Sequence, residues 1–407
     1  MKINVSKTFA VIFNDHKRSG KTHAQLARHC NWFILGQPIE IKDTAKFLGI
    51  TYHQVKGCEA APEDLASKGR RASHAMFTAM QGHYINQSAF LCRIFDQLVK
   101  PVLSYGCQIW GPDVFCDHLD DHSILSRRKN PLEGVHIDFL RLLGGLPPSS
   151  PLWILFNEFQ RTPLHFLWIK LCARFWEKIV HSNHENENVL LREAMHDNIQ
   201  LAVDGCSKCW VAKFIQSLVL IDALSQQALD ACVTIHDYTA LPITESVVKA
   251  KLAQFWESCT GRVLGDSGDP RSIPDDIPNT HVRYQSWVAC GGRPAHLMAF
   301  LPTHIKHMLL RLRCTSFPLA IQQGRRKSYS DRVPRSKRYC KACLADGLEL
   351  VEDDKHFLIE CRYLSNIRLN YPTIFHDNAT PASILNFSDQ CLLGKAIQSM
   401  LLHRTVW

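Results

Sequence analysis

Three cysteines and one histidine near the C-terminus have a spacing that is typical of zinc sites. Cys340 and Cys343 flank two residues, twelve residues separate Cys343 from His356, and four more precede Cys361. Two cysteines on a tight turn can direct both thiolates at one ion, and tetrahedral zinc takes four nitrogen and sulfur ligands of this kind. The sequence therefore predicts zinc as a structural cofactor, in a closed site formed by these four side chains.

The last two of these residues reach one ion only under a geometric condition. The run FLIEC predicts a short helix that carries His356 and Cys361. Residues five apart on a regular α-helix are rotated by about 500°, which leaves them roughly 140° away from a common face. The helix must therefore end or distort between them. The alternative is a helix with a buried histidine and a buried cysteine beside an unrelated Cys-x2-Cys pair.

A local excess of positive charge lies directly before and within this region. Between positions 306 and 341, eleven Lys or Arg residues face only Asp331, a net +10, whereas the whole chain carries +9, so the other 371 residues sum to −1. A basic stretch beside a small metal module is typical of proteins that bind RNA or DNA, although it also suits a solvated linker. The predicted phosphate contacts are Arg325, Arg326, Lys327, Arg332, Arg335, Lys337, Arg338 and Lys341.

Length and composition set broad limits on the protein class. A chain of 407 residues with 46% apolar and 21% charged residues is expected to form two or three globular domains. No apolar run reaches 18 residues, so no membrane partner is expected, and the first apolar run predicts a strand rather than a signal peptide. Sixteen cysteines without a secretory signal are expected to be reduced. We therefore expect a protein of the nucleus or cytoplasm that is not secreted.

Hydrophobic periodicity predicts a mainly α-helical fold with a small N-terminal α+β piece. The predicted strands cover 7–13, a hairpin over 32–41 that turns at Gly36-Gln37, and 45–52. Pro101 is expected to kink one of the helices, and a Gly- and Pro-rich stretch over 261–279 predicts a linker. The predicted helices cover 62–80, 88–103, 131–143, 153–159, 163–181, 189–203, 209–221, 245–259, 295–313 and 390–402.

Several segments, taken in order, resemble the reverse transcriptases of LINE-type (non-LTR) retrotransposons. INVSKTFAVIF, WFILGQPIEI and KFLGI resemble the end of that family's palm, and RIFDQLVKPVLSYGCQIWG resembles its thumb helix. FLRLLGGLPPSSP and FQRTPL are similar to the segment after the thumb. RLRCTSFPLAIQQGRR, YCKAC and EDDKHFLIECRYLSNIR resemble the family's C-terminal Cys-Cys-His-Cys region. The resemblance spans most of the chain from Ile3 to Arg368.

This resemblance implies a modular chain. It divides into the strands of a three-stranded palm remnant (1–58), a helical thumb (59–146), a helical connector (147–260), a linker with a basic helical segment (261–330), a zinc-knuckle-like module (331–370) and a helical tail (371–407). Phe47, Leu48 and Gly49 fall at the primer-grip turn of the family. Lys7 falls at a palm lysine proposed to act near the leaving pyrophosphate.

The resemblance also implies an RNA-directed DNA polymerase, but no catalytic residue is assigned in this chain. Phosphoryl transfer of this kind needs carboxylates that hold two metal ions. In the family these lie upstream of Lys7, where MKINVS has none. Magnesium is therefore expected only if an upstream catalytic palm completes the site. The Asp120-Asp121, Asp275-Asp276 and Asp353-Asp354 pairs are expected in solvated loops.

We therefore expect a truncated reverse transcriptase fragment that does not polymerise alone but retains RNA or DNA binding through the thumb and the basic Cys/His module. One alternative is the C-terminal part of an active or split polymerase, with the remainder of that retroelement polymerase as a partner. Another is a helical scaffold for protein interaction in which zinc only stabilises the fold. Cys206 and Cys209 form a weaker Cys-x2-Cys pair, for which His196 and Cys232 are poorly spaced partners.

Overall fold

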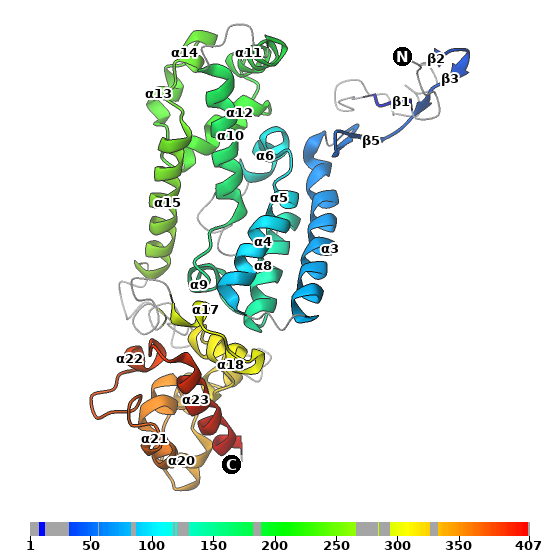
Figure 1. Cartoon of the computed structure of the whole chain (residues 1–407). Helices are drawn as coiled ribbons and strands as arrows, with labels where there is room; N and C mark the ends of the chain where they lie inside the picture. Colours follow the sequence, from blue (N-terminus) through cyan, green and yellow to red (C-terminus); the bar gives the residue numbers. More distant parts are fainter. Residues whose placement is uncertain are drawn as a thin grey trace.

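The protein is built mainly from α-helices, which form an elongated body with a few short strands at one end and the C-terminal module at the other (Figure 1). The computed structural model describes residues 8–12, 32–55, 57–82, 87–116, 119, 130–181, 189–265, 284, 294–325 and 333–405. Across these residues, no helix combines the length and the apolar character that crossing a membrane requires. The predicted mainly α fold class is therefore confirmed.

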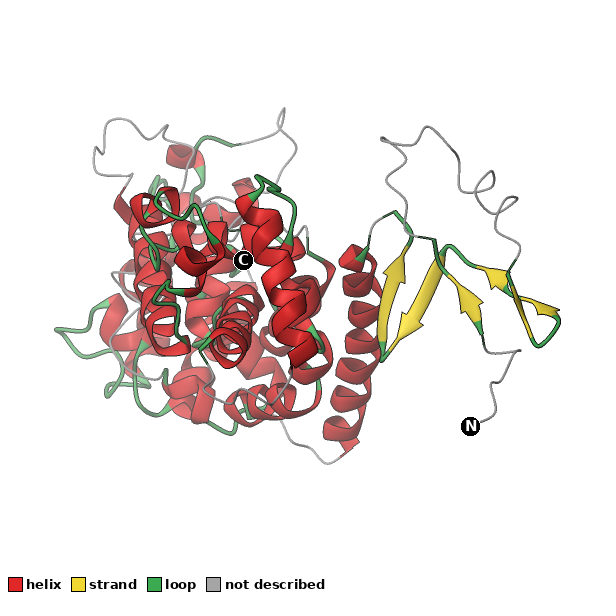
Figure 2. Cartoon of the chain, turned by 90° about the horizontal axis from the view of Figure 1, so that it is seen from above, coloured by secondary structure: helices red, strands yellow, loops and turns green. Residues whose placement is uncertain are grey.

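Short strands make up the N-terminal piece, which lies to one side of the helices, with the β5–β6 hairpin beside α3 (Ala61–Gly82) (Figure 2). They pair two by two: β1 with β4 in parallel, and β2 with β3 and β5 with β6 as antiparallel hairpins. The single three-stranded sheet that we predicted is therefore wrong for the described residues. The strands are β1 (Phe9–Ala10), β2 (Phe33–Ile34), β3 (Gln37–Pro38), β4 (Glu40–Ile41), β5 (Thr44–Phe47) and β6 (Ile50–His53).

Both hairpins turn at a leucine followed by a glycine. The strand predicted over 45–52 is in fact a hairpin, because Leu48 and Gly49 have φ of 47° and 85° and reverse the chain. The other hairpin turns at Leu35-Gly36, with φ of 51° and 75°, one residue before the predicted turn. Two successive positive φ values match the right-handed twist of paired strands, and glycine is the residue that adopts them most readily.

The predicted helices of this part are present, with breaks at prolines, whereas the helix over Cys107–Phe115 was not predicted. The predicted helix over 88–103 divides at Val99 because Pro101 has no backbone N–H to continue it. The predicted helix over 295–313 likewise divides, with Pro302 before its second half. The first group consists of α3 (Ala61–Gly82), α4 (Ser88–Leu98), α5 (Lys100–Leu103), α6 (Cys107–Phe115) and α8 (Pro131–Gly144).

Helix α8 begins and ends as its sequence predicts. The Asn130 side chain accepts a hydrogen bond from the backbone N–H of Leu132 at 2.8 Å, which satisfies a donor left open by the first turn. Pro131 occupies the first turn, where its missing N–H costs nothing. Gly145 ends the helix with φ of 59°.

A second group of helices covers one side of the first (Figure 1). Helix α15 extends to Gly265, so the predicted linker starts as helix, and its remainder through 279 lies outside the described residues. Trp153, Trp168 and Trp176 are buried and belong to the core. The group consists of α9 (Leu152–Glu158), α10 (Leu164–Val180), α11 (Val189–Val203), α12 (Trp210–Leu220), α13 (Gln226–Asp230), α14 (Ile235–Thr239) and α15 (Glu245–Gly265).

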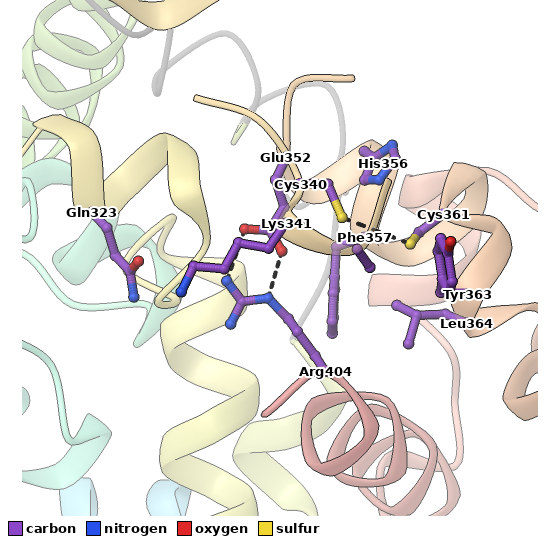
Figure 3. Close-up of a pocket in the computed structure, with 11 residues that line it drawn as sticks. Gln323, Cys340, Lys341, Glu352, His356, Phe357, Cys361, Tyr363, Leu364 and Arg404 are labelled. Atoms are coloured by element: carbon purple, nitrogen blue, oxygen red, sulfur yellow. Dashed lines mark hydrogen bonds and ion pairs between the residues drawn. The ribbon is translucent and has the colours of Figure 1, made fainter. Parts of the chain in front are cut away.

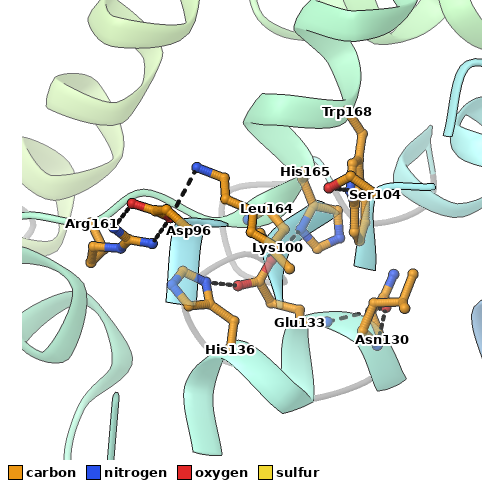
Figure 4. Close-up of polar contacts among 11 residues, drawn as sticks. Asp96, Lys100, Ser104, Asn130, Glu133, His136, Arg161, Leu164, His165 and Trp168 are labelled. Carbon is orange, nitrogen blue, oxygen red and sulfur yellow. Dashed lines mark hydrogen bonds and ion pairs between the residues drawn. The ribbon is translucent and has the colours of Figure 1, made fainter. Parts of the chain in front are cut away.

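A buried carboxylate joins α8 to α10 (Figure 4). Glu133 accepts hydrogen bonds from the backbone N–H of Leu164 at 2.6 Å, from His136 Nδ1 at 3.0 Å and from His165 Nδ1 at 3.2 Å. Although burial by itself would raise the pKa of Glu133, the hydrogen bonds from the two histidines lower it to about 2. The ionised carboxylate therefore caps the first turn of α10 from inside the core.

A second buried carboxylate joins this body to the C-terminal part. Glu158, at the end of α9, accepts hydrogen bonds from Arg313 Nε and, at 2.7 Å, from the Tyr284 hydroxyl. Arg313 Nη1 also donates to the Leu385 carbonyl. Arg313 is the last residue of α18 (Thr303–Arg313), which follows α17 (Ala295–Met298). Because Glu158 and Arg313 are both buried, this pair fixes how the C-terminal module docks.

Candidate metal centre

The four predicted ligands lie together in a small C-terminal module. Figure 3 shows three of them, Cys340, His356 and Cys361. Cys340 directly precedes α20 and Cys343 lies within it, whereas His356 starts a single π-helical turn that Cys361 follows. The elements of the module are α19 (Ala320–Arg325), the 3-10 turn η5 (Arg335–Lys337), α20 (Lys341–Ala345), the π turn η6 (His356–Glu360), the 3-10 turn η7 (Arg362–Leu364), α21 (Ser365–Leu369), α22 (Pro381–Leu385) and α23 (Gln390–Thr405).

Distances among the ligand atoms fit one tetrahedral ion. All four side chains are buried, and their ligand atoms lie within 4.8 Å of one another. Cys361 Sγ is 4.0 Å from both Cys340 Sγ and Cys343 Sγ, and Cys343 Sγ is 3.5 Å from His356 Nε2. Around tetrahedral zinc, two sulfurs are about 3.8 Å apart and a sulfur and a nitrogen about 3.6 Å apart. The cluster can therefore hold a metal ion such as zinc.

The π turn meets the geometric condition set by the sequence. The backbone N–H of Cys361 donates to the His356 carbonyl five residues earlier, at 2.8 Å, which closes a wider turn than an α-helix makes. Cys361 itself is extended, with ψ of 112°. The helix therefore distorts and ends between the two ligands, which brings side chains five positions apart to the same point. Asp353, predicted in a solvated loop, instead accepts the His356 N–H at 2.9 Å.

Two backbone hydrogen bonds favour thiolates at this cluster, whereas burial and the neighbouring sulfurs raise the pKa of Cys343 and of Cys361. The contact between Cys340 and Cys361 lowers the pKa of Cys340 and raises that of Cys361, as one proton shared between two sulfurs requires. The backbone N–H of Cys343 hydrogen-bonds Cys340 and that of Tyr363 hydrogen-bonds Cys361, and each of these bonds lowers the pKa of the thiol. Metal ligation needs deprotonated sulfur, so both backbone contacts prepare the ligand loops for a cation.

A pair of backbone contacts holds the first ligand loop closed. Tyr339 and Val351 form an isolated antiparallel bridge, and the Cys340 N–H donates to the Leu350 carbonyl at 2.8 Å. Inside the loop, the Leu348 N–H donates to the Cys343 carbonyl at 3.0 Å. The two cysteines therefore lie on a short chain reversal whose ends are tied together.

Three residues that the sequence analysis did not single out anchor the module. Arg404 of α23 pairs with the buried Glu352, and the second oxygen of Glu352 also accepts the Ala320 N–H at 2.6 Å. Arg368 donates to the carbonyl of Cys361, directly behind the last ligand. No local pattern points to these pairs, because their partners lie far away in the sequence or in the backbone. The contacts of Glu352 join α19 and α23 to the ligand loops, and Arg368 holds the backbone at Cys361.

A cavity of about 190 Å³ adjoins the ligands. Cys340, His356 and Cys361 form one wall, and Gln323, Lys341 and Arg404 line another part (Figure 3). Arg404 is paired with Glu352 there, and a zinc ion with three thiolates would carry a net charge of −1. The positive groups of the cavity are thus balanced, which disfavours it as an anion site.

Burial divides the predicted phosphate contacts into two kinds. Arg338 is wrong as a phosphate contact, because it is buried and donates to the carbonyls of Val333 at 2.8 Å and Ile321 at 3.0 Å. Lys337 and Lys341 are exposed, and Arg335 is half-buried. Arg326, Lys327 and Arg332 lie outside the described residues, as does the Arg325 side chain, although Arg325 ends α19.

The remaining predicted site residues lie elsewhere. Phe47 and Leu48 are exposed at the tip of the β5–β6 hairpin, and Tyr105 donates from its hydroxyl to the Leu48 carbonyl at 2.8 Å while its ring packs against Gly49. Lys7, Asp120-Asp121 and Asp275-Asp276 lie outside the described residues. Asp354, which we expected in a solvated loop, is buried.

The second Cys-x2-Cys pair, Cys206 and Cys209, lies at the start of a helix, which Cys209 caps. Cys209 Sγ accepts the Ala212 N–H at 3.4 Å, which caps the first turn of α12, and the Cys209 thiol donates to the Cys206 carbonyl at 3.2 Å. In the part of the chain that the structure describes, Cys340, Cys343, His356 and Cys361 form the one group of metal-ligand spacing. A comparison with protein-family models, curated proteins and solved structures found no match to this chain.

Proposed function

We propose that this protein binds RNA or DNA through a basic segment that contains Arg335 and Lys337, and that a zinc ion in the Cys340, Cys343, His356 and Cys361 cluster holds this segment in place. The observation that carries the proposal is the buried Cys3His cluster directly behind that segment. Zinc suits the ligand set because three thiolates and an imidazole in tetrahedral reach are its usual structural ligands. All four ligands come from the protein, which leaves no position for an activated water and supports a structural role.

Two basic side chains of η5 support the proposed phosphate contact. Lys337 is exposed and Arg335 half-buried, and both lie in η5, a few residues before the first ligand. The buried Arg338, directly after η5, anchors this turn to α19 through the Ile321 carbonyl. A short irregular turn offers no rigid pattern of donors to read bases, whereas the arginine fork fits phosphate oxygens. We infer a contact that is independent of sequence.

The segments that resemble a LINE-type reverse transcriptase give this binding a context. We infer that β5, β6 and the helices α3 to α8 correspond to the end of the palm and the thumb of such an enzyme. The order of the segments along the chain supports this reading. Among the described Asp pairs, Asp353 accepts the backbone N–H of His356 and Asp354 is buried. We therefore propose binding, and not polymerisation, for this chain alone.

A protein-interaction scaffold is the second candidate. It is favoured by the burial of Lys306, Arg313 and Arg338, since these three members of the basic stretch serve the fold rather than a ligand. In that case zinc would only stabilise the module. The two functions differ in how binding responds to salt, because counterion release accompanies phosphate contacts.

Charge reversal at Arg335 and Lys337 tests the proposal. The double variant Arg335→Glu, Lys337→Glu should bind a single-stranded RNA more than tenfold more weakly, and the slope of log affinity against log salt should become shallower by about 1.4, since two contacts at about 0.7 each are lost. The loss should be similar for RNAs of different sequence. Fluorescence anisotropy titrations at several salt concentrations provide both quantities.

The matched control is Lys178→Glu, Lys208→Glu, which makes the same change in charge at two exposed lysines outside the module. It should bind nearly as the parent does. Equal affinity of the two double variants would refute the proposed contact and favour the scaffold. If the variant lost binding to one RNA sequence and kept binding to the others, these side chains would read bases instead.

A further inference from the structure

A groove between α10 and α15 has the chemistry of a site for one nucleotide of a single strand. Its volume is about 360 Å³. Phe166 and Trp256 line its apolar part, and Lys100, Lys170, Lys249 and Glu257 line its polar part. Pockets that hold one small ligand occupy about 300–1,000 Å³ and combine an apolar wall with a few polar groups.

Helix geometry places these side chains in two facing rows. Phe166, Lys170 and Arg174 are four residues apart on α10, and residues at this spacing share one face at intervals of about 6 Å. Arg174 pairs with Glu245 at the start of α15, with Nε to Oε2 at 2.6 Å. At the other end, the Trp256 ring meets the Phe166 ring edge-on, with centroids 5.8 Å apart. The two helices are therefore fixed at both ends of the groove.

Positive charge predominates inside the groove. Three ammonium groups line it against the single carboxylate of Glu257, a net +2. Lys100 Nζ lies 3.4 Å from Asp96, whose carboxylate also holds Arg161 (Figure 4). Among the described residues, no carboxylate lies within ion-pair distance of Lys170 or Lys249. Both lysines also lie near Glu245, whose pKa is lowered first by Arg174 and further by Lys170 and Lys249. Because Arg174 already holds that carboxylate, the two ammonium groups can bind an anion, and Lys249 is exposed.

We propose that this groove binds one nucleotide unit of a single-stranded RNA or DNA, with its phosphate at Lys170 and Lys249 and its base against Trp256 and Phe166. Positive side chains beside an aromatic surface are the usual means by which proteins bind single strands without sequence preference. The groove is too small for a duplex. The proposal rests on the proposed function, because it assumes that the protein binds nucleic acid, and it adds a contact on the helical body remote in sequence from the basic segment.

The test is the double variant Lys170→Ala, Lys249→Ala, probed with a uridine-only single-stranded RNA of about 20 nucleotides, longer than the site of one binding module. Affinity should fall roughly tenfold at 0.1 M salt, and the salt slope should become shallower by about 1.4, because two phosphate contacts are lost. Thiouridine in the same RNA should photo-crosslink to the α15 peptide that contains Trp256 in the parent protein and not in the variant.

The control is Lys208→Ala, Lys395→Ala, which removes two exposed lysines that do not line the groove. A groove variant that binds and cross-links like this control overturns the proposal. It is also overturned if UTP alone saturates the groove and displaces the RNA from it, since the site would then take a free nucleotide.

The two proposals can fail separately. The Arg335→Glu, Lys337→Glu variant should keep its cross-link to α15 although its overall affinity is lower. Weak binding by the groove variant together with parental binding by the Arg335 and Lys337 variant would support the groove and reject the basic segment. The reverse pattern would reject the groove, and a parent protein that binds no RNA would reject both.

Discussion

Replacing Cys343 with serine should remove the metal from the C-terminal module and open its ligand loops. Cys343 is fully buried, and its sulfur contacts both Cys361 and His356, so it lies at the middle of the cluster. Ligation of structural zinc contributes about 10–16 kcal/mol in small zinc-binding peptides at neutral pH, which exceeds the stability of most small modules. Loss of one thiolate should therefore leave the module without its main source of stability.

Hydrogen exchange followed by mass spectrometry shows this effect region by region. In Cys343→Ser, amides over 338–368 should exchange much faster than in the parent, whereas α8 and α10 should remain protected because their core lies in the helical body. The control is Cys391→Ser, which changes an exposed cysteine of the same module that is not a ligand. Unchanged protection in Cys343→Ser would mean that packing alone holds the ligand loops.

Replacing Glu158 with alanine should destabilise the whole protein by about 3–5 kcal/mol, because it leaves the buried Arg313 guanidinium without its partner. Glu158 and Arg313 are both buried, and Arg313 also binds the Leu385 carbonyl at the end of α22. The Tyr284 hydroxyl would lose its acceptor as well. The loss should appear in urea unfolding as a lower midpoint.

The position of this pair gives the variant a second expected signature. Glu158 belongs to the helical body, whereas Arg313 and Leu385 belong to the C-terminal part, so the change should also loosen the docking between them. The control is Glu245→Ala, which breaks the solvent-exposed pair with Arg174 and should cost much less. An equal loss of stability in the two variants would contradict a structural role for the buried pair.

The ligand set of the metal centre could be predicted from the sequence because its spacing is local. Cys340 and Cys343 lie on one turn, and the condition on His356 and Cys361 follows from helix geometry alone. The π turn that satisfies this condition could not be predicted, since it depends on how Arg368 and the neighbouring helices fix the backbone around Cys361. The local sequence allows either a regular helix or a distorted turn between His356 and Cys361, and tertiary contacts favour the distorted turn.

For the basic stretch over 306–341, by contrast, the sequence could not predict which side chains are exposed. Net charge counts every Lys and Arg equally, but burial separates Arg338 and Arg313, which bind carbonyls and a carboxylate inside the fold, from the exposed Lys337. Burial depends on partners such as Ile321 and Glu158 that are distant in the sequence. The break of the strand predicted over 45–52 at Leu48 has a similar origin, because the hydroxyl of Tyr105, from the turn between α5 and α6, binds the hairpin turn.

Elemental analysis of the intact chain, purified without chelator and without a histidine tag, tests the metal centre most directly. The account predicts close to one zinc per chain in the parent and in Cys391→Ser, and close to none in Cys343→Ser. A parent protein that contains almost no metal, while its amides over 338–368 remain protected from hydrogen exchange, would contradict it.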